Sequence, residues 1–373
     1  MEFSKYADVN PKCGKVPNSF YYIDLECVNA GEIKDLRIEM AETAPSRAQR
    51  VLTLYDILFQ TVRPYQKNNY HFKAENDLPT VASTGYAVFR TEQSSEYLYE
   101  LIHTERFLSD IMKRCTGTSF PAVSSSDIED IAIWIPEFQE QKKIGDFLTL
   151  VDTKIAKQRL LIEHLKKYKR GLLDKLLEDN STDANWHIVR LQDVANGFDY
   201  GMNSAATTFD GVHKYIRITD IDDDSRQYLS DDIVSPSDTP EEKYRVSDND
   251  ILFARTGASV GKSYLYTPDD GALYFAGFLI RISVKKEYDS YFVYLNTLTS
   301  KYEKWLRLES MRSGQPGVNA EQYRNYAFRC PNYQTQVKIA NIIKGIDSKI
   351  LKERMSLSKL NSLKNGLLQQ LFI

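Results

Sequence analysis

The sequence predicts an α+β protein in which two mixed α/β domains alternate with two long helices. The helices are expected to pair as an antiparallel coiled coil, which makes the chain pseudo-two-fold symmetric. Three observations carry this prediction: an ungapped internal repeat, a heptad pattern inside the repeat, and strand-rich stretches between its copies. The predicted segments are residues 1–134, 135–180, 181–329 and 330–373.

The repeat aligns residues 136–177 with residues 331–372 at a constant offset of 195, without a gap. Sixteen of the forty-two aligned positions are identical, including two that matter below, Asp152/Asp347 and Lys169/Lys364. A duplication this long, with half a chain between its copies, predicts that domains and helices alternate.

Each copy of the repeat predicts one long helix. Its apolar residues recur in steps of four and three, which is the heptad pattern of a coiled-coil seam. Polar residues interrupt both seams at the same places, Gln158 and Lys169 in the first and Glu353 and Lys364 in the second. A helix over 144–177 spans roughly 50 Å and cannot bury its stripe alone, so the other copy is its expected partner. The chain must return between the copies, which favours antiparallel pairing. The predicted seam consists of Val151, Ile155, Ile162, Leu165, Leu172, Leu176, Ile346, Ile350, Leu357, Leu360, Leu367 and Leu371.

The stretches between the helices are related more loosely. They are rich in β-branched and aromatic residues punctuated by glycine, proline and asparagine, which predicts mixed domains with short strands. Residues 56–59 and 250–253 both read Asp-Ile-Leu-Phe, and Tyr22 aligns with Tyr215 at an offset of 193. That alignment places the counterpart of Trp186, which opens the second domain, before residue 1. We therefore expect the first domain to lack its opening strand, either because this domain begins differently or because the given start is late.

Composition limits the possible classes of protein. The chain of 373 residues, with 42% hydrophobic residues, is long enough for two or three folded domains. Its net charge of −3 means that any nucleic-acid surface is local or completed by a partner. Four separated cysteines without a C-x-x-C pair indicate neither a zinc site nor a disulfide framework. The chain has no signal core and no run of transmembrane length, so we expect a cytoplasmic protein that does not engage a membrane.

The stretch 255–263 is similar to a phosphate-binding loop, but that motif requires glycine where this chain has Thr256. The residues that follow, 263–268, predict a strand that runs into a turn, whereas a phosphate-binding loop opens a helix. We therefore expect a glycine-rich hairpin or a plain surface turn, with nucleotide hydrolysis as the weaker alternative. The histidines are scattered, and neither H-E-x-x-H nor G-x-S-x-G occurs. The sequence predicts a chain without catalytic residues, metal or cofactor of its own.

The order domain, helix, domain, helix resembles the specificity subunit of type I restriction–modification systems. The helix starts, Gln139-x-Gln141-x-x-Ile144 and its copy at 334–339, resemble the conserved regions of that family, as do the helix ends Lys169-x-Gly171-Leu172-Leu173 and 364–368. The motif Trp186-x-x-x-Arg190-Leu191-x-x-Val194 resembles the start of its target recognition domain, and residues 250–257 resemble a core strand and loop of that domain. The resemblance covers nearly the whole chain and is specific as a pattern, although each motif alone is weak.

The resemblance implies recognition without catalysis. Each target recognition domain reads one half of a split sequence in double-stranded DNA, while the paired helices fix the spacer and dock two methyltransferase subunits. These partners methylate adenine with S-adenosylmethionine, and two restriction (motor-nuclease) subunits that use ATP with Mg can join them to cleave unmodified DNA. Two such readers would meet successive major-groove exposures, about 34–36 Å apart.

Candidate DNA-contacting residues are chosen by side-chain chemistry, since arginine suits guanine and asparagine or glutamine suits adenine. For each of them the alternative is a solvated polar loop residue. In the first domain they are Arg63, Lys67, Asn68, Asn69, Arg90, Thr118 and Ser119. In the second domain they are Arg255, Thr256, Ser259, Lys262, Arg312, Ser313, Gln315 and Asn319. The heptads alone also allow a different class of protein, a coiled-coil interaction scaffold that reads no DNA.

Overall fold

The computed structural model describes residues 1–178, 185–310 and 317–372. The chain divides into two compact units, and each is described by itself. Unit 1 comprises Met1–Arg159 with Met355–Ile373, and unit 2 comprises Leu160–Arg354. The two long helices, α4 (Phe138–Glu178) and α9 (Tyr333–Leu371), each contribute one segment to both units.

Unit 1 is built on two four-stranded sheets with the orders β1-β10-β7-β8 and β5-β2-β9-β6. Strands β2 and β9 run parallel, while the other pairings in these sheets are antiparallel. The elements are β1 (Asp8–Val9), β2 (Ser19–Ile23), β3 (Val28–Asn29), β4 (Glu32–Ile33), β5 (Arg37–Met40), β6 (Ala48–Val51), β7 (Ile57–Gln60), β8 (Tyr70–His71), β9 (Thr80–Ser83), β10 (Tyr86–Arg90), α1 (Ser95–Leu101), α2 (Glu105–Arg114) and α3 (Ser125–Glu129).

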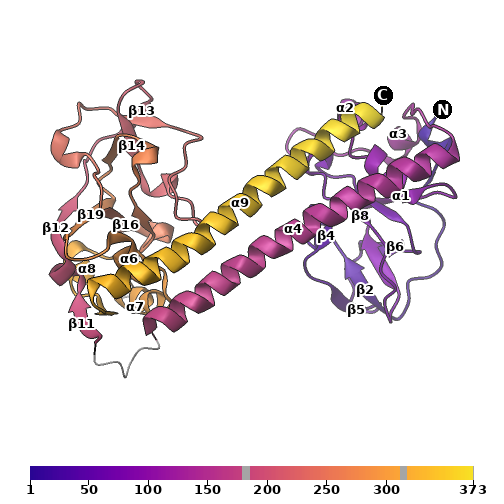
Figure 1. The fold of residues 1–373 in the computed structure, drawn as a ribbon. Coiled ribbons are helices and arrows are strands. Elements are labelled where there is room, and N and C mark those ends of the chain that lie inside the picture. Colours follow the sequence, from indigo (N-terminus) through magenta and orange to yellow (C-terminus); the bar gives the residue numbers. More distant parts are fainter. Residues whose placement is uncertain (179–184, 311–316, 373) are drawn as a thin grey trace. The chain divides into compact units, whose positions relative to one another are not determined.

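Unit 2 repeats this plan around the sheet β12-β19-β16-β17, of which Figure 1 labels β12, β19 and β16. Its strands β14 and β18 pair in parallel as β2 and β9 do. The elements are β11 (His187–Arg190), α5 (Leu191–Val194), β12 (Ala195–Tyr200), β13 (Ala206–Thr208), β14 (Lys214–Ile216), β15 (Val234–Pro236), β16 (Asp250–Ala254), β17 (Ser263–Leu265), β18 (Leu273–Phe275), β19 (Leu279–Val284), α6 (Ser290–Leu295), α7 (Ser300–Ser310), α8 (Ala320–Arg324) and β20 (Ala327–Cys330). The predicted α+β class is confirmed.

The two Asp-Ile-Leu-Phe stretches form the same buried strand in each unit. Strands β7 and β16 are buried at every position, as a central strand covered on both faces should be. The aspartate before or at the start of the strand is also buried in both units and folds back on the chain. Asp56 accepts a hydrogen bond from the backbone N–H of Thr53, and Asp250 accepts one from that of Ser247.

The long helices run antiparallel in each unit. In unit 2, Lys169 of α4 pairs with Asp347 of α9, and in unit 1, Asp152 of α4 pairs with Lys364 of α9. All twelve predicted seam residues are buried or half-buried. Helix α4 begins at Phe138, earlier than the expected start near Ile144.

The expectation that the first domain lacks its opening strand is wrong in part. Glu2 forms an antiparallel bridge with Ala132, and Met1 and Ile133 exchange two backbone hydrogen bonds of 2.7 and 2.8 Å. Ala132 corresponds to Ala327 at the offset of 195, and Ala327 pairs with Arg190 of the opening strand in unit 2. The first residues of the chain therefore occupy the place of the end of that strand.

Candidate nucleic-acid interface

Two loops meet at the same place in each unit. In unit 1, Val62, which follows β7, bridges Ala122, which precedes α3. In unit 2, Thr256, which follows β16, bridges Gly317, which precedes α8. These bridge positions are related by offsets of 194 and 195, so the duplication has placed the same loop pair in both units. Loops carried by rigid sheets are common sites of recognition.

In unit 1 this loop pair presents an arginine stacked on an exposed aromatic ring. The guanidinium carbon of Arg63 lies 4.3 Å from the centroid of Phe120, a cation–π distance. Phe120 is 63% exposed and Tyr65, in the same loop as Arg63, is 49% exposed. Thr118 and Ser119 precede Phe120 and are also exposed. Two exposed rings beside an arginine and two hydroxyls form a surface suited to bases and sugar-phosphate groups.

In unit 2 an arginine beside the bridged loop is also stacked, although it aligns with Thr61 and not with Arg63 at the offset of 194. The guanidinium carbon of Arg255 lies 5.0 Å from the ring centroid of Tyr200, and the Tyr200 hydroxyl accepts a hydrogen bond from the backbone of Ala320. Arg255, Thr256 and Ser259 are half-buried at this edge. Both units therefore hold an arginine against an aromatic ring beside the bridged loops.

The phosphate-loop-like stretch is a hairpin, as expected. Strands β16 and β17 pair antiparallel, and the loop between them contains a short 3₁₀ turn, Gly257–Ser259. Gly261 has a φ of +79°, and a Cβ at this position would lie 2.1 Å from Leu306. Glycine is favoured here, because another residue would strain the left-handed backbone and would require the side chain of Leu306 to move. The glycines serve this turn, so the nucleotide-binding hypothesis is not supported.

Several candidate side chains are committed to contacts inside their domain. Asn69 is buried and its carbonyl oxygen accepts from the backbone N–H of Gln60. Arg90 donates to Asp56 at 2.8 and 2.7 Å, which neutralises that buried carboxylate. These two residues stabilise unit 1, which argues against direct contact with DNA.

The same holds for two candidates of unit 2. Lys262 is 5% exposed, and its ammonium donates to the carbonyl of Ile221 at 2.9 Å and pairs with Asp223 at 2.5 Å. Asn319 is the N-cap of α8, since its side-chain oxygen accepts from the backbone N–H of Gln322 at 2.9 Å.

Two further candidates of unit 1, Lys67 and Asn68, are half-buried. The ammonium of Lys67 pairs with Glu105 at 2.8 Å, and the side chain of Asn68 accepts from the backbone of Ala30 at 3.3 Å. Arg312, Ser313 and Gln315 lie outside the described residues. Sequence reasoning missed Phe120, Tyr65 and Tyr200, because nothing in a sequence distinguishes an exposed aromatic residue from a core one.

The structure also bears on metal sites, disulfides and membrane-spanning helices. Among the described residues, no group of three or more histidine, cysteine, aspartate or glutamate side chains could hold a metal ion. The four cysteines are free thiols. Within residues 1–178, 185–310 and 317–372, no helix combines the length and apolar character that a membrane span needs.

Two domains of one plan, each presenting a bridged loop pair and each built onto both long helices, define a class of duplicated recognition protein. Residues 55–166 and 183–361 match the family described as the type I restriction modification DNA specificity domain. These ranges cover more than half of the chain, which therefore belongs to this family.

The similar proteins agree with this membership. The chain is 25% identical over 170 residues to the specificity subunit of the type I restriction enzyme HindI of Haemophilus influenzae, covering 42% of this chain and 36% of that protein. It is 23% identical over 304 residues to the MjaVIII specificity subunit of Methanocaldococcus jannaschii, covering 73% of this chain and 68% of that protein. The chain thus spans about a third of the first relative's length.

Two solved structures share the fold. One belongs to a study of complex assembly and conformational transition of the type I R-M system, with a TM-score of 0.63, 18% identity, and coverage of 100% of this chain and 96% of that chain. The other is a type I restriction–modification S subunit from M. genitalium, with a TM-score of 0.62, 15% identity, and coverage of 100% and 95%.

Proposed function

We propose that this chain is the DNA specificity subunit of a type I restriction–modification complex, in which each unit reads one half of a bipartite site in double-stranded DNA. The observation that carries the proposal is the repeated loop pair, bridged at Val62–Ala122 and at Thr256–Gly317, in a chain of a DNA specificity family. Two equivalent readers in one chain match a target that has two halves.

The chemistry of the loops supports this role. Arg63, Thr118 and Ser119 in unit 1, and Arg255 and Thr256 in unit 2, carry groups that bind base edges or phosphates. With a net charge of −3, the chain has little capacity to neutralise phosphates by itself. We therefore assign sequence reading to this chain and most of the phosphate contacts to its partners.

The partners in this proposal are two adenine methyltransferase subunits, joined in the cleaving form by two motor-nuclease subunits. Exposed apolar residues at equal repeat positions support the docking of one partner twice. Phe147 and Ile342 are 48% and 50% exposed, and Tyr168 and Leu363 are 61% and 54% exposed. S-adenosylmethionine, and ATP with Mg, would be used by these partners, and the chain itself would be non-catalytic.

The test is a domain exchange read by the methylome. Residues 181–329 are replaced by the corresponding domain of another specificity subunit, and the chimera is co-expressed with the methyltransferase. Long-read sequencing should show a new sequence in one half-site and the original sequence in the other. A change in both half-sites would contradict the assignment of one reader to each domain.

A mobility-shift assay separates the proposed function, which predicts sequence-specific retention of DNA, from the scaffold alternative, which predicts no retention. The chain co-purified with its methyltransferase should retain a duplex that carries the methylated motif and release one in which a half-site is scrambled. A complex that retains neither duplex would favour a protein-interaction scaffold.

A further inference from the structure

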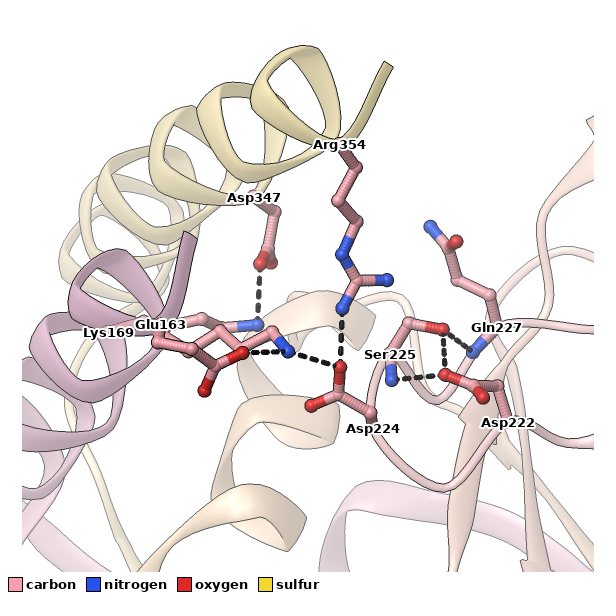
Figure 2. Close-up of polar contacts among 9 residues, drawn as sticks. Glu163, Lys169, Asp222, Asp224, Ser225, Gln227, Asp347 and Arg354 are labelled. Atoms are coloured by element: carbon pink, nitrogen blue, oxygen red, sulfur yellow. Dashed lines mark hydrogen bonds and ion pairs between the residues drawn. The ribbon is translucent and has the colours of Figure 1, made fainter. Parts of the chain in front are cut away.

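A single carboxylate in unit 2 contacts both long helices. Asp224 lies in the turn between Ile221 and Tyr228, which are joined by an antiparallel bridge. Its Oδ2 atom pairs with the ammonium of Lys166 on α4 at 2.7 Å and with the guanidinium of Arg354 on α9 at 2.5 Å. In Figure 2 a dashed line joins the labelled Asp224 carboxylate to the guanidinium of Arg354.

The turn that carries Asp224 has a defined shape. Asp222 accepts from the backbone N–H and from the hydroxyl of Ser225, both at 2.6 Å (Figure 2). Arg226 has a φ of +60°, in the left-handed region that few residues other than glycine adopt. A turn with these constraints presents its carboxylate in one direction, so its contact with the helices is geometrically specific.

The same turn also holds the loop of residues 257–261 between β16 and β17, which follows Arg255 and Thr256 of the proposed interface and is called the reading loop below. Asp223 and the carbonyl of Ile221 bind the buried ammonium of Lys262, which directly follows the loop 257–261. The carbonyl of Gly261, in that loop, accepts a hydrogen bond from Tyr302. A continuous set of polar contacts therefore runs from the reading loop through the turn to both helices.

Neither the duplication nor stability explains this arrangement. The repeat position of Lys166 is Asn361, so the second copy lacks that cation. The side chains of Lys166, Arg354 and Asp224 are 28%, 34% and 54% exposed, and ion pairs this accessible to water contribute little to stability. The contact instead fixes the orientation of the turn relative to the helices, because it joins one turn to both of them.

We propose that Asp224 is a positioning residue that fixes the reading loop 257–261 of unit 2 on the helix pair. The consequence rests on the proposed function: the position of this loop along DNA sets the spacer at which the second half-site is accepted. One base pair displaces a half-site by about 3.4 Å. A loop freed from the helices should therefore accept spacers one base pair longer or shorter, while the half-site sequences stay the same.

The first measurement uses the full chain without DNA. Hydrogen exchange is compared between Asp224→Asn, which keeps the side-chain size and removes the charge, and Asp269→Asn, which removes an exposed aspartate elsewhere in unit 2. Exchange should rise in residues 221–228 and also in residues 257–262 in Asp224→Asn and stay at the wild-type level in the control. A rise limited to 221–228 would overturn the coupling.

The second measurement uses the chain co-expressed with its methyltransferase. The methylated share of half-site pairs is counted for the native spacer and for spacers one base pair shorter and longer. Asp224→Asn and Lys166→Met should raise the share at the altered spacers severalfold, whereas Asp269→Asn and Lys167→Met, in an exposed neighbouring lysine, should not.

The proposal is overturned if the spacer profile is unchanged. It is also overturned if methylation falls equally at every spacer, which is the result that a merely structural role would give. If the wild-type chain directs no methylation at all, the proposed function fails. The exchange comparison then decides the coupling by itself.

Discussion

Lys169 and Asp347 form an ion pair of 2.6 Å between α4 and α9 in unit 2. Unit 1 contains the same pair with the helices exchanged, because Lys364 of α9 contacts Asp152 of α4 at 2.6 Å. All four residues lie at positions that are identical in the two copies of the repeat. An antiparallel pair of like helices makes each contact twice, so one lysine–aspartate combination fixes the register in both units.

The two lysines should contribute differently to the stability of their units. Lys364 also lies 3.1 Å from Glu100, which is 1% exposed, whereas the repeat position of Glu100 is Leu295. Lys364→Met removes the cation beside the buried carboxyl of Glu100 and the partner of Asp152, and should cost about 2 kcal/mol at pH 8, measured by hydrogen exchange of unit 1. Lys169→Met should cost about 1 kcal/mol in unit 2. The double variant Lys364→Met/Glu100→Gln should recover most of the loss, and no recovery would mean that Glu100 is not the cause.

Glu100 should make unit 1 less stable at high pH. Burial raises the pKa of this carboxyl from 4.5 to about 7, although Lys364 opposes the shift. The folded state therefore holds a proton that the unfolded chain has released, and the resulting stability is lost as the pH rises from 4.5 through 7. Glu100→Gln should raise the melting temperature more at pH 8 than at pH 5, with a gain on the order of 1–3 kcal/mol at pH 8. A lower melting temperature at pH 8 would show that the attraction to Lys364 outweighs burial.

Two histidines should make unit 1 unstable in acid. Burial lowers the pKa of His71 to about 3 and that of His103 to about 4, from 6.5. Each contributes stability above pH 6.5 that is lost as the pH falls toward its folded value, about 2 kcal/mol by pH 5. Hydrogen exchange at pH 7.5 and pH 5 should show unit 1 opening before unit 2. Equal sensitivity of the two units would contradict this expectation.

Of the repeated glutamines at the helix starts, the buried ones should contribute more to stability than the exposed ones. Gln141 and Gln336 are 1% and 2% exposed, and each donates to the carbonyl of the proline five residues earlier, at 2.8 and 2.9 Å. Replacing either with alanine leaves buried polar groups unpaired and should cost about 1–3 kcal/mol in urea unfolding. Gln139→Ala and Gln334→Ala are the matched controls, since these equally repeated glutamines are exposed. An effect of similar size in the controls would point to helix propensity instead.

Phe120 should contribute to DNA reading and little to stability. Its ring is 63% exposed and lies against Arg63. Phe120→Ala should weaken binding of the methyltransferase complex to its duplex by about 1–3 kcal/mol, measured by titration at fixed salt, if a base or sugar packs on the ring. The control is Ile38→Ala, at a side chain 57% exposed elsewhere in unit 1. Equal binding by the Phe120 variant would remove this ring from the interface.

The helices were predictable because their signal is local. A heptad pattern and an ungapped repeat can be read along the chain, and both long helices occur where the repeat lies. The start of α4 was missed by several residues, because it depends on the buried amide of Gln141 bound to Pro136 and to the hydroxyl of Tyr6. Tyr6 lies far from Gln141 in the sequence, so no local sequence pattern predicts this contact.

The candidate interface was predictable only in outline. From residue type alone, Lys262 and Arg63 are equally good candidates for contact with DNA. In the structure the ammonium of Lys262 is buried against Ile221, while Arg63 is half-buried against the exposed ring of Phe120. Which polar side chain is used inside the domain depends on neighbours that the sequence does not place.

The sequence by itself determined the duplication, the α+β alternation and the antiparallel direction of the helices, because each follows from periodicity and chain connectivity. The tertiary structure alone decided which repeated positions remain equivalent. It set Lys364 against a buried glutamate but gave Lys169 no such neighbour, and it brought Asp224 to both helices in unit 2. These contacts join residues more than fifty positions apart, and only the packed fold brings such side chains within reach of one another.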